Sequence, residues 1–256
     1  MKVISLQSGS NGNCIYVETG NTRFLIDAGI SGKRAEQRLG AFDWDIRDVD
    51  AILISHDHGD HIACAGIYQR KFKLPLYITP PTLEATQIHR PIGQLDDVRH
   101  FSAGDVLKFN GVTVETIPTP HDGTDGVVFV VDDGRHRLGV LTDLGHVFDG
   151  LARLVSTLDA VIIESNYDPK MLAGGPYPYF LKQRISGPHG HLSNVEAAEL
   201  LTGSVGAKLQ WACLGHLSAE NNRPDLAIAT HRRILGDSLP LHVAGRYEAA
   251  EPIDLH

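Results

Sequence analysis

The sequence predicts an α/β (α+β) protein in which two β-sheets pack face to face and helices cover their outer faces. The chain has 256 residues, of which 42% are apolar and 21% charged, an ordinary balance for a protein with a buried core. Strand-like runs separated by turns dominate each half of the chain, and helical patterns follow them in both halves. The sequence contains no strong internal repeat and no low-complexity linker, so we expect one domain over residues 1–256.

The first half is expected to contain short strands joined by Gly- and Asn-rich turns. Ser31 is a suitable N-cap for a helix that ends at Leu39, and a second helix is expected over Ile62–Phe72. The segment "TPPTLEATQIH" begins with prolines suited to a first helical turn and predicts a third helix. Apolar and β-branched residues predict strands at Val3–Leu6, Ile15–Glu18, Phe24–Ile26, Ala51–Ser55 and Leu76–Ile78.

In the second half, strands are again expected to be followed by helices. The turn signals "FNGV" and "DDGR" predict hairpins within Val106–Leu141. Helical patterns are expected at Leu151–Leu158, Asn194–Leu201 and Asp225–Leu235. Further strands are expected at Ala160–Glu164, Lys208–Leu214 and Leu239–Ala244.

Cysteine usage and the N-terminal sequence favour a soluble cytoplasmic protein. The three cysteines, Cys14, Cys64 and Cys213, are too few and odd in number for a disulfide framework, which favours a reducing compartment. The opening "MKVISLQSGSNGN" lacks the apolar core of a signal peptide, and no apolar run approaches the length of a bilayer span. We therefore expect no association with membranes.

The net charge of −8 gives the chain no general attraction for nucleic acid. Two local basic stretches, Gly32–Arg38 and Tyr68–Lys73, are interpreted as solvated helix faces. They would contact a nucleic-acid backbone only if both bordered the functional site. A local basic patch or a metal centre remains a way for an acidic protein to bind phosphate.

The segment "ISHDHGDHIA" predicts a metal site directly after a buried strand. His56, His58, Asp60 and His61 are metal-ligand types, and strand-like alternation places His56 and His58 on one side. Imidazole and carboxylate suit Zn²⁺, Mn²⁺ or Fe, and two facing subsets suit two ions. Asp57 lies between two ligands in the sequence and is expected to point away from them.

One loop cannot complete two coordination shells, so other strand ends must contribute ligands. His121, Asp143 and His216 each follow a strand-like run, where a sheet can aim a loop residue. A lone histidine is more often a surface or core residue than a metal ligand. These three residues become candidate ligands only because three His and two Asp lie together within residues 56–61. The predicted sets are His56, His58 and His121 for one ion, Asp60, His61 and His216 for the other, and Asp143 as a bridge.

The stretch "SHDHGDH" resembles the HxHxDH signature of the metallo-β-lactamase fold. The blocks "LQSGSNGNCIYVETGNTRFLIDAGISGKRAEQRL", "IIESNYDPKML" and "LGHLSAENN" resemble the YycJ/WalJ-type branch of that superfamily, and Gly59 and Tyr167 depart from its usual Ser and His. The resemblance implies a four-layer αβ/βα sandwich with two metals at one edge and the ligand sets given above. It also implies kinship with ribonuclease Z-like and J-like nucleases, and 5′-to-3′ exonuclease activity on DNA.

Two further stretches have both functional and structural interpretations. His191 in "GPHGHLSN" matches a motif of the branch, and it would hold a phosphate or protonate a leaving oxygen if it faced the metals. A structural histidine is the alternative, since Ser193 is a good N-cap for the following helix. "SGSNGN" at Ser8–Asn13 lacks the Walker lysine, so we interpret it as a loop lining the active-site edge or as a plain turn.

The sequence therefore predicts a dinuclear metal-dependent hydrolase with phosphodiester, preferably DNA, as substrate. Two metal ions would lower the pKa of a shared water, so no side-chain nucleophile is needed. Asp60 would orient the hydroxide, and His191 is the second catalytic candidate. Zn²⁺ and Mn²⁺ both accept these ligands. The alternatives are a small-molecule hydrolase acting on a lactone or thioester, and a non-catalytic metal-stabilised regulatory module.

Overall fold

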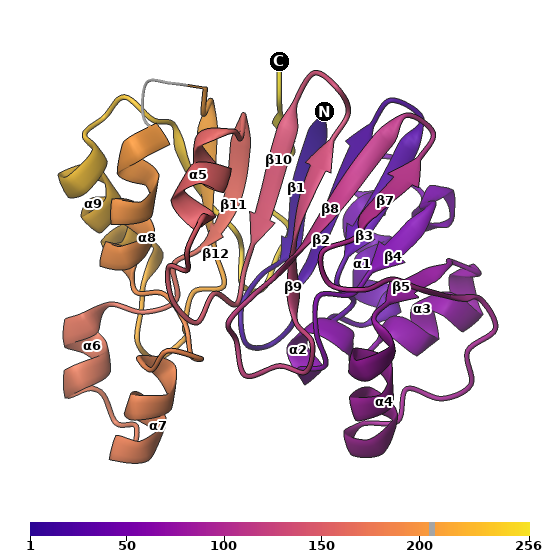
Figure 1. Ribbon diagram of the computed structural model, residues 1–256, viewed down its shortest axis with the longest axis horizontal. Helices are drawn as coiled ribbons and strands as arrows, with labels where there is room; N and C mark the ends of the chain where they lie inside the picture. The colour runs from indigo at the N-terminus through magenta and orange to yellow at the C-terminus, as the bar shows by residue number, and fades with distance from the viewer. Residues whose placement is uncertain (205–207) are drawn as a thin grey trace.

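Two mixed β-sheets face each other in the computed structural model, which describes residues 1–204 and 208–256 (Figure 1). The first sheet has the spatial order β14 (Ile253–Asp254), β1 (Lys2–Gln7), β2 (Cys14–Thr19), β3 (Thr22–Ile26), β4 (Ala51–Leu53), β5 (Leu76–Ile78) and β6 (Val98–His100). The second has the order β13 (Leu241–Val243), β12 (Trp211–Gly215), β11 (Ala160–Glu164), β10 (Arg137–Leu141), β9 (Val127–Asp132), β8 (Val112–Pro118) and β7 (Val106–Phe109).

Alternating side chains give each sheet two apolar faces. In β2, Ile15 and Val17 enter the core between the sheets, whereas Cys14 and Tyr16 pack beneath the helices on the other side. The same division applies in the second sheet, where Val161 packs under the outer helices and Ile162 enters the central core. A strand buried on both faces needs this period-two arrangement of apolar residues.

Helices complete the outer layers, which confirms the predicted αβ/βα sandwich. One outer layer contains α1 (Gly32–Gly40), α3 (Ala65–Phe72) and α4 (Pro80–His89), and the short helix η1 (Ile46–Asp48) lies beside α1. The other contains α5 (Leu151–Ser156), α8 (Asn194–Leu201), η2 (Thr202–Ser204) and α9 (Pro224–Leu235). Among the described residues, no helix is both long and apolar enough to cross a bilayer.

The helix starts follow the capping residues in the sequence. The Ser31 hydroxyl accepts a hydrogen bond from the backbone of α1, as predicted. Ser193 and Glu196 form a capping box at the start of α8, and Thr79 caps α4 ahead of Pro80. Local sequence therefore determines where these helices begin.

The helix expected over Ile62–Phe72 is divided into α2 (Gly59–Ile62) and α3, so that prediction is wrong in its continuity. The backbone N–H of Cys64 donates to the Ala28 carbonyl, which lies outside both helices. The Ala28 N–H in turn donates to the His61 carbonyl at 2.7 Å, and a side chain on Gly29 would overlap the Asp60 carbonyl oxygen. The loop after β3 therefore takes the hydrogen bonds that a continuous helix would use.

Several strands end at the edge where α2 begins. Asp27 follows β3, Asp143 lies two residues beyond β10, and His216 follows β12. All three adopt left-handed backbone conformations, with φ values of 64°, 58° and 52°. Non-glycine residues adopt this conformation infrequently, and it is concentrated at functional sites. The turns redirect these side chains at one edge of the sandwich.

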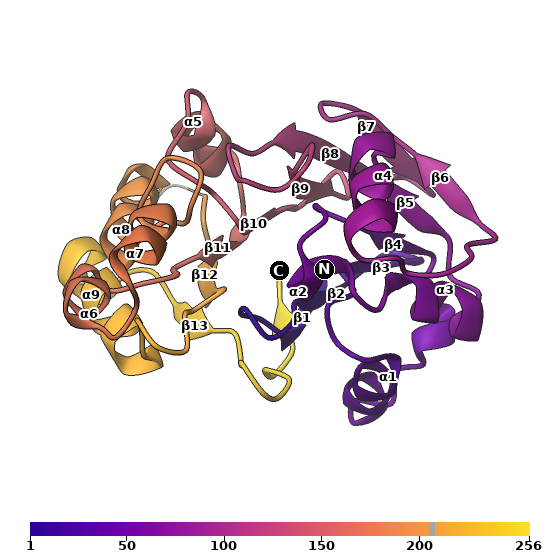
Figure 2. The same cartoon turned by 90° about the horizontal axis from the view of Figure 1, so that it is seen from below.

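Two helices that the sequence analysis missed, α6 (Pro169–Gly174) and α7 (Tyr179–Ile185), project from this edge. In both views α2 lies between α4 on one side and α6 and α7 on the other (Figure 1 and Figure 2). The chain termini lie at the opposite end of the strands in Figure 1, where β14 pairs with β1. The edge around α2 is thus free of the termini and flanked by helices.

Candidate metal centre

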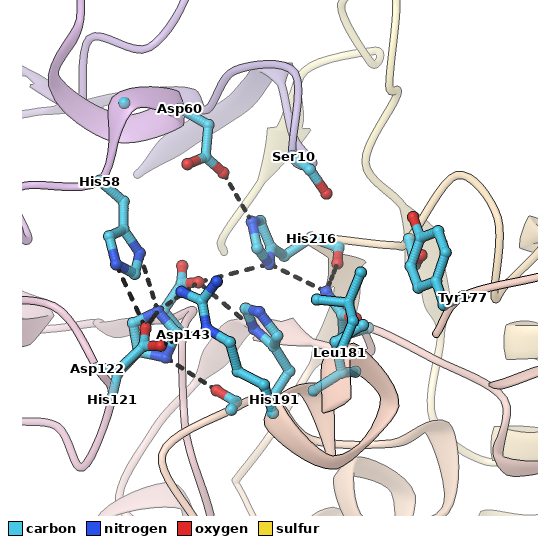
Figure 3. Close-up of a pocket in the computed structure, with 16 residues that line it drawn as sticks. Ser10, His58, Asp60, His121, Asp122, Asp143, Tyr177, Leu181, His191 and His216 are labelled. Atoms are coloured by element: carbon cyan, nitrogen blue, oxygen red, sulfur yellow. Dashed lines mark hydrogen bonds and ion pairs between the residues drawn. The ribbon is translucent and has the colours of Figure 1, made fainter. Parts of the chain in front are cut away.

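The residues predicted as ligands come together in two groups at this edge, and Figure 3 shows those that line a cavity, namely His58, Asp60, His121, Asp143 and His216. His56, His58 and His121 each offer a ring nitrogen, and these atoms lie within 4.8 Å of one another. Ligand-type atoms of Asp60, His61 and His216 form a second group within the same limit. The two groups match the two predicted sets, and their binding of metal stays a prediction.

Asp143 lies between the groups. Its Oδ1 is 3.5 Å from His121 Nε2 in the first group, and its Oδ2 is 3.1 Å from His61 Nε2 in the second. The carboxylate is almost completely buried, so both oxygens face the cluster rather than solvent. One carboxylate with an oxygen toward each group has the position expected of a bridging ligand.

Contacts at Nδ1 fix the ring orientations of three histidines. His61 Nδ1 lies 2.6 Å from Asp27 Oδ2, His56 Nδ1 lies 2.9 Å from the Ser55 hydroxyl, and His121 Nδ1 lies 2.8 Å from the Gly190 carbonyl. A hydrogen bond at one ring nitrogen leaves the other available to a metal ion. The buried Nε2 of His56 has no hydrogen-bond partner among the described residues, so it is available to ligate a metal ion.

Glu164 is the equivalent support on the other side of the centre. Its Oε1 lies 3.1 Å from His216 Nδ1 and 2.6 Å from His191 Nδ1, and its Oε2 accepts from the backbone N–H groups of Leu144 and Leu192. The side chain is completely buried. It therefore orients both imidazoles while its own charge is satisfied by hydrogen bonds.

Sequence reasoning missed Asp27 and Glu164. Both carry a signal that it used elsewhere, because Asp27 follows β3 directly and Glu164 is the last residue of β11. A carboxylate at the end of a buried apolar strand is costly to bury without a partner. That cost, applied to every strand end, would have identified both residues.

The electrostatics of the centre favour bound positive charge. Burial opposes ionisation of Asp143, but His216 and His61 hold its pKa well below the usual range. Burial also disfavours a charged His216, yet the Asp143, Asp60 and Glu164 carboxylates outweigh it and raise its pKa to about 10. His56 has the opposite balance, and burial and the neighbouring His61 lower its pKa well below the ordinary value. The ionised carboxylates therefore draw positive charge to this edge, and a metal ion that binds His216 has to displace the proton that the raised pKa keeps on the ring.

A cavity of about 390 Å³ opens over the two groups. Asp60, His191 and His216 line one side, and Tyr177 and Leu181 line another (Figure 3). This volume lies within the range of small-molecule and nucleotide-sized sites.

The Ser8–Asn13 loop lies at this edge, as one of its two interpretations expected. The Asn13 side-chain amide donates to Asp60 Oδ2 at 3.3 Å, and the Ser8 hydroxyl accepts from the His216 backbone N–H at 2.8 Å. Ser10 lines the cavity. The loop thus ties β1 and β2 to the group formed by Asp60, His61 and His216.

Other predicted features lie outside the centre. Asp57 points away, and its carboxylate accepts from the Thr124 N–H at 2.7 Å. His189 is exposed, whereas His191 lines the cavity. Neither Gly32–Arg38 nor Tyr68–Lys73 contributes to the cavity lining, so the condition for their contact with nucleic acid is not met.

The two positions that depart from the branch pattern have separate environments. A side chain at Gly59 would meet the guanidinium of Arg90 at 2.7 Å, so glycine makes room for that arginine beside the cavity. Tyr167 lies outside this cavity and lines a neighbouring one between α6 and α7. Its replacement of histidine therefore removes no group from the metal cavity.

Known proteins share the sequence and the fold of this chain. Residues 8–171 match the family model of the metallo-beta-lactamase superfamily. Exodeoxyribonuclease WalJ of Streptococcus pneumoniae strain D39 is 38% identical over 229 residues, which cover 88% of this chain and 84% of the relative. Exodeoxyribonuclease YycJ of Bacillus anthracis is 35% identical over 232 residues, which cover 90% of this chain and 87% of the relative.

Solved structures with low sequence identity share the fold. The metallo-beta-lactamase fold protein YhfI of Bacillus subtilis has a TM-score of 0.74 and 18% identity, covering 97% of this chain and 98% of its own. Zn²⁺-bound PqqB of Methylobacterium extorquens has a TM-score of 0.75 and 16% identity, covering 100% of both chains. These likenesses concern the arrangement of layers and strands only.

Replacing Asp143 should remove more bound metal than replacing Asp57. Asp143→Ala deletes the carboxylate between the two groups, whereas Asp57→Ala deletes one that faces Thr124. Elemental analysis of metal-replete protein should give about two transition-metal ions per wild-type chain. Equal metal content in the two variants would contradict the assignment of Asp143, and one ion or none in the wild type would contradict a dinuclear centre.

Proposed function

The chain belongs to the metallo-beta-lactamase superfamily, and from this premise we propose that it is a metal-dependent exonuclease that removes nucleotides from the 5′ end of DNA. One observation carries the proposal: relatives named exodeoxyribonucleases align with 88–90% of the chain, far beyond the HxHxDH loop. The complete set of ligand-type residues beneath an open cavity supports catalysis over a purely structural role.

The donor set supports a centre for two divalent cations. His56, His58 and His121 would hold one, Asp60, His61 and His216 would hold the second, and Asp143 would contact both. Such cations, when bound, neutralise charge on a phosphodiester and lower the pKa of a water between them. We propose Zn²⁺ or Mn²⁺, because imidazole and carboxylate ligands accept either.

The chain's own residues would position the reacting groups. The Asp60 carboxylate is partly exposed and lines the cavity. Its Oδ2 lies 3.3 Å from His216 Nε2 and accepts a hydrogen bond from the Asn13 side-chain amide. It would orient the attacking water by accepting one of its protons in a hydrogen bond. The surrounding buried side chains restrict solvent access, which strengthens each of these polar interactions.

His191 is proposed as the residue that meets the leaving oxygen. Its Nδ1 is occupied by Glu164, so Nε2 is the ring nitrogen available to a substrate in the cavity. From there it would donate a hydrogen bond to a phosphate oxygen or a proton to the departing alkoxide. Glu164 holds the ring in one orientation for either role.

Purified protein supplied with Mn²⁺ or Zn²⁺ should shorten 5′-labelled DNA from the labelled end. Asp60→Asn should abolish turnover, because the amide cannot act as the same ligand or acceptor, and its circular dichroism should match the wild type. Gel analysis of products from DNA and RNA, beside a lactone and thioester panel, makes the measurement. Turnover of a lactone or thioester without cleavage of either nucleic acid would identify a small-molecule hydrolase instead.

His191→Ala should lower turnover by ~10²-fold or more if the imidazole protonates the leaving oxygen. Metal content should be unchanged, because His191 is outside the proposed ligand sets. His189→Ala is the matched control from the same loop, and it should cost much less because His189 is exposed.

A nitrophenyl phosphodiester distinguishes the two roles of His191, since its leaving group needs little protonation. Partial recovery of His191→Ala on this substrate indicates proton transfer, and equal losses on both substrates indicate phosphate binding. Wild-type activity in His191→Ala would return the residue to a structural role.

A further inference from the structure

The segment from α6 to the start of α8 differs from the rest of the chain in charge. Residues 169–195 contain no Asp or Glu, although the chain has 31 acidic residues and a net charge of −8. The same segment carries Lys170, Lys182 and Arg184. Because acidic residues are lacking, the helices that project beside the metal cavity carry a net positive charge, which complements a polyanion.

α7 exposes large apolar side chains that do not pack in any hydrophobic core of the part of the chain that the structure describes. None of its residues is buried, and the side chains of Tyr179 and Phe180 are among the most exposed large apolar ones, at 76% and 73%. Leu181, Arg184 and Ile185, spaced three and four residues apart, line the metal cavity from one face of the helix. α7 therefore lines the cavity with three side chains and exposes two aromatic rings to solvent.

Arg184 is the only Lys or Arg among the described residues that line the cavity. Its Nε donates to Asp122 Oδ2 at 2.7 Å, and Asp122 Oδ1 lies 3.3 Å from His58 Nε2. This contact uses only Nε, so both terminal nitrogens of this largely exposed side chain can still donate hydrogen bonds. The guanidinium is therefore anchored next to the metal groups with donors to spare for a phosphate oxygen.

Phe180 lies one helical turn before Arg184. Side chains four residues apart are neighbours on a helix surface, so the exposed ring and the anchored guanidinium lie on the same face of α7. An aromatic face next to a cation matches the repeating base and phosphate of an unpaired strand. A duplex would offer the phosphate but keep its base faces stacked and hidden.

We propose that α7 is the docking surface for an unpaired DNA strand, with Arg184 on a backbone phosphate and Phe180 stacked against a base. This inference rests on the proposed nuclease function and adds the form of substrate that the site accepts. Single-stranded ends and 5′ overhangs should be degraded in preference to blunt duplex ends.

The first test measures binding without turnover. In an Asp60→Asn background, fluorescence anisotropy with a labelled single-stranded oligodeoxynucleotide gives the Kd. Phe180→Ala should raise Kd by ~10-fold or more, since loss of one base stack has that size. Arg184→Ala should raise Kd by ~10-fold or more, since it removes a charged hydrogen bond to a phosphate. Phe180→Tyr keeps a stacking face and should bind like the parent. Arg233→Ala, an exposed arginine on α9, is the charge control and should leave Kd unchanged.

The second test separates this inference from the proposed function. For otherwise wild-type protein, Phe180→Ala should lower kcat/KM for the oligonucleotide relative to an abasic oligonucleotide of the same length by ~10-fold, because the abasic strand keeps its phosphates but has no base to stack. If the wild type degrades DNA and Phe180→Ala retains its Kd and KM, the docking surface is wrong and the nuclease stands.

Two other outcomes also overturn the inference. A wild type that cleaves only a nitrophenyl phosphodiester, and whose Asp60→Asn form binds no oligonucleotide, removes both the nuclease and the docking surface. A Phe180→Ala variant that changes from dimer to monomer in sedimentation, with unchanged Kd for DNA, assigns the exposed aromatic surface to self-association.

Discussion

Buried carboxylates impose the constraint on which the rest of this edge depends. Asp27, Asp143 and Glu164 are withdrawn from water, and an ionised carboxylate in such a place is costly unless cations or hydrogen bonds compensate it. Imidazoles supply part of that compensation, since His61 faces Asp27 and His216 faces Glu164. Each pairing occupies Nδ1 of one imidazole and leaves its Nε2 directed at the other residues of the proposed ligand group. The same contacts that satisfy buried charge therefore prepare a site for divalent cations.

The sandwich brings these groups together from distant parts of the chain. β3 and β4 of one sheet lead to Asp27 and the HxHxDH loop, whereas β10, β11 and β12 of the other lead to Asp143, Glu164 and His216. Neither sheet alone assembles either proposed ligand group, because His121 and His216 join residues of the α2 region across the edge. Formation of the centre and closure of the two sheets are thus coupled, as is common for metal sites in folded proteins.

Strong periodic patterns made much of the fold predictable. β5, β11 and α8 have the expected bounds, and the rule that ligands follow strand ends located all seven proposed ligand residues. Glu164 was missed because it was counted as the last residue of a strand, whereas ligands were sought only after strand ends. The break before α3 depends on the Ala28 carbonyl, a contact distant in sequence. α6 and α7 are short, flanked by proline and glycine, and α7 buries no residue, so an apolar period could not reveal it.

The central claim is that one edge of the sandwich holds two metal ions between two groups of side chains. Anomalous X-ray diffraction from crystals of metal-replete protein, collected on both sides of the metal absorption edge, tests it most directly. Two peaks about 3.5–4 Å apart are expected, one beside His56, His58 and His121 and the other beside Asp60, His61 and His216. A single peak, or peaks remote from Asp143, would contradict the account.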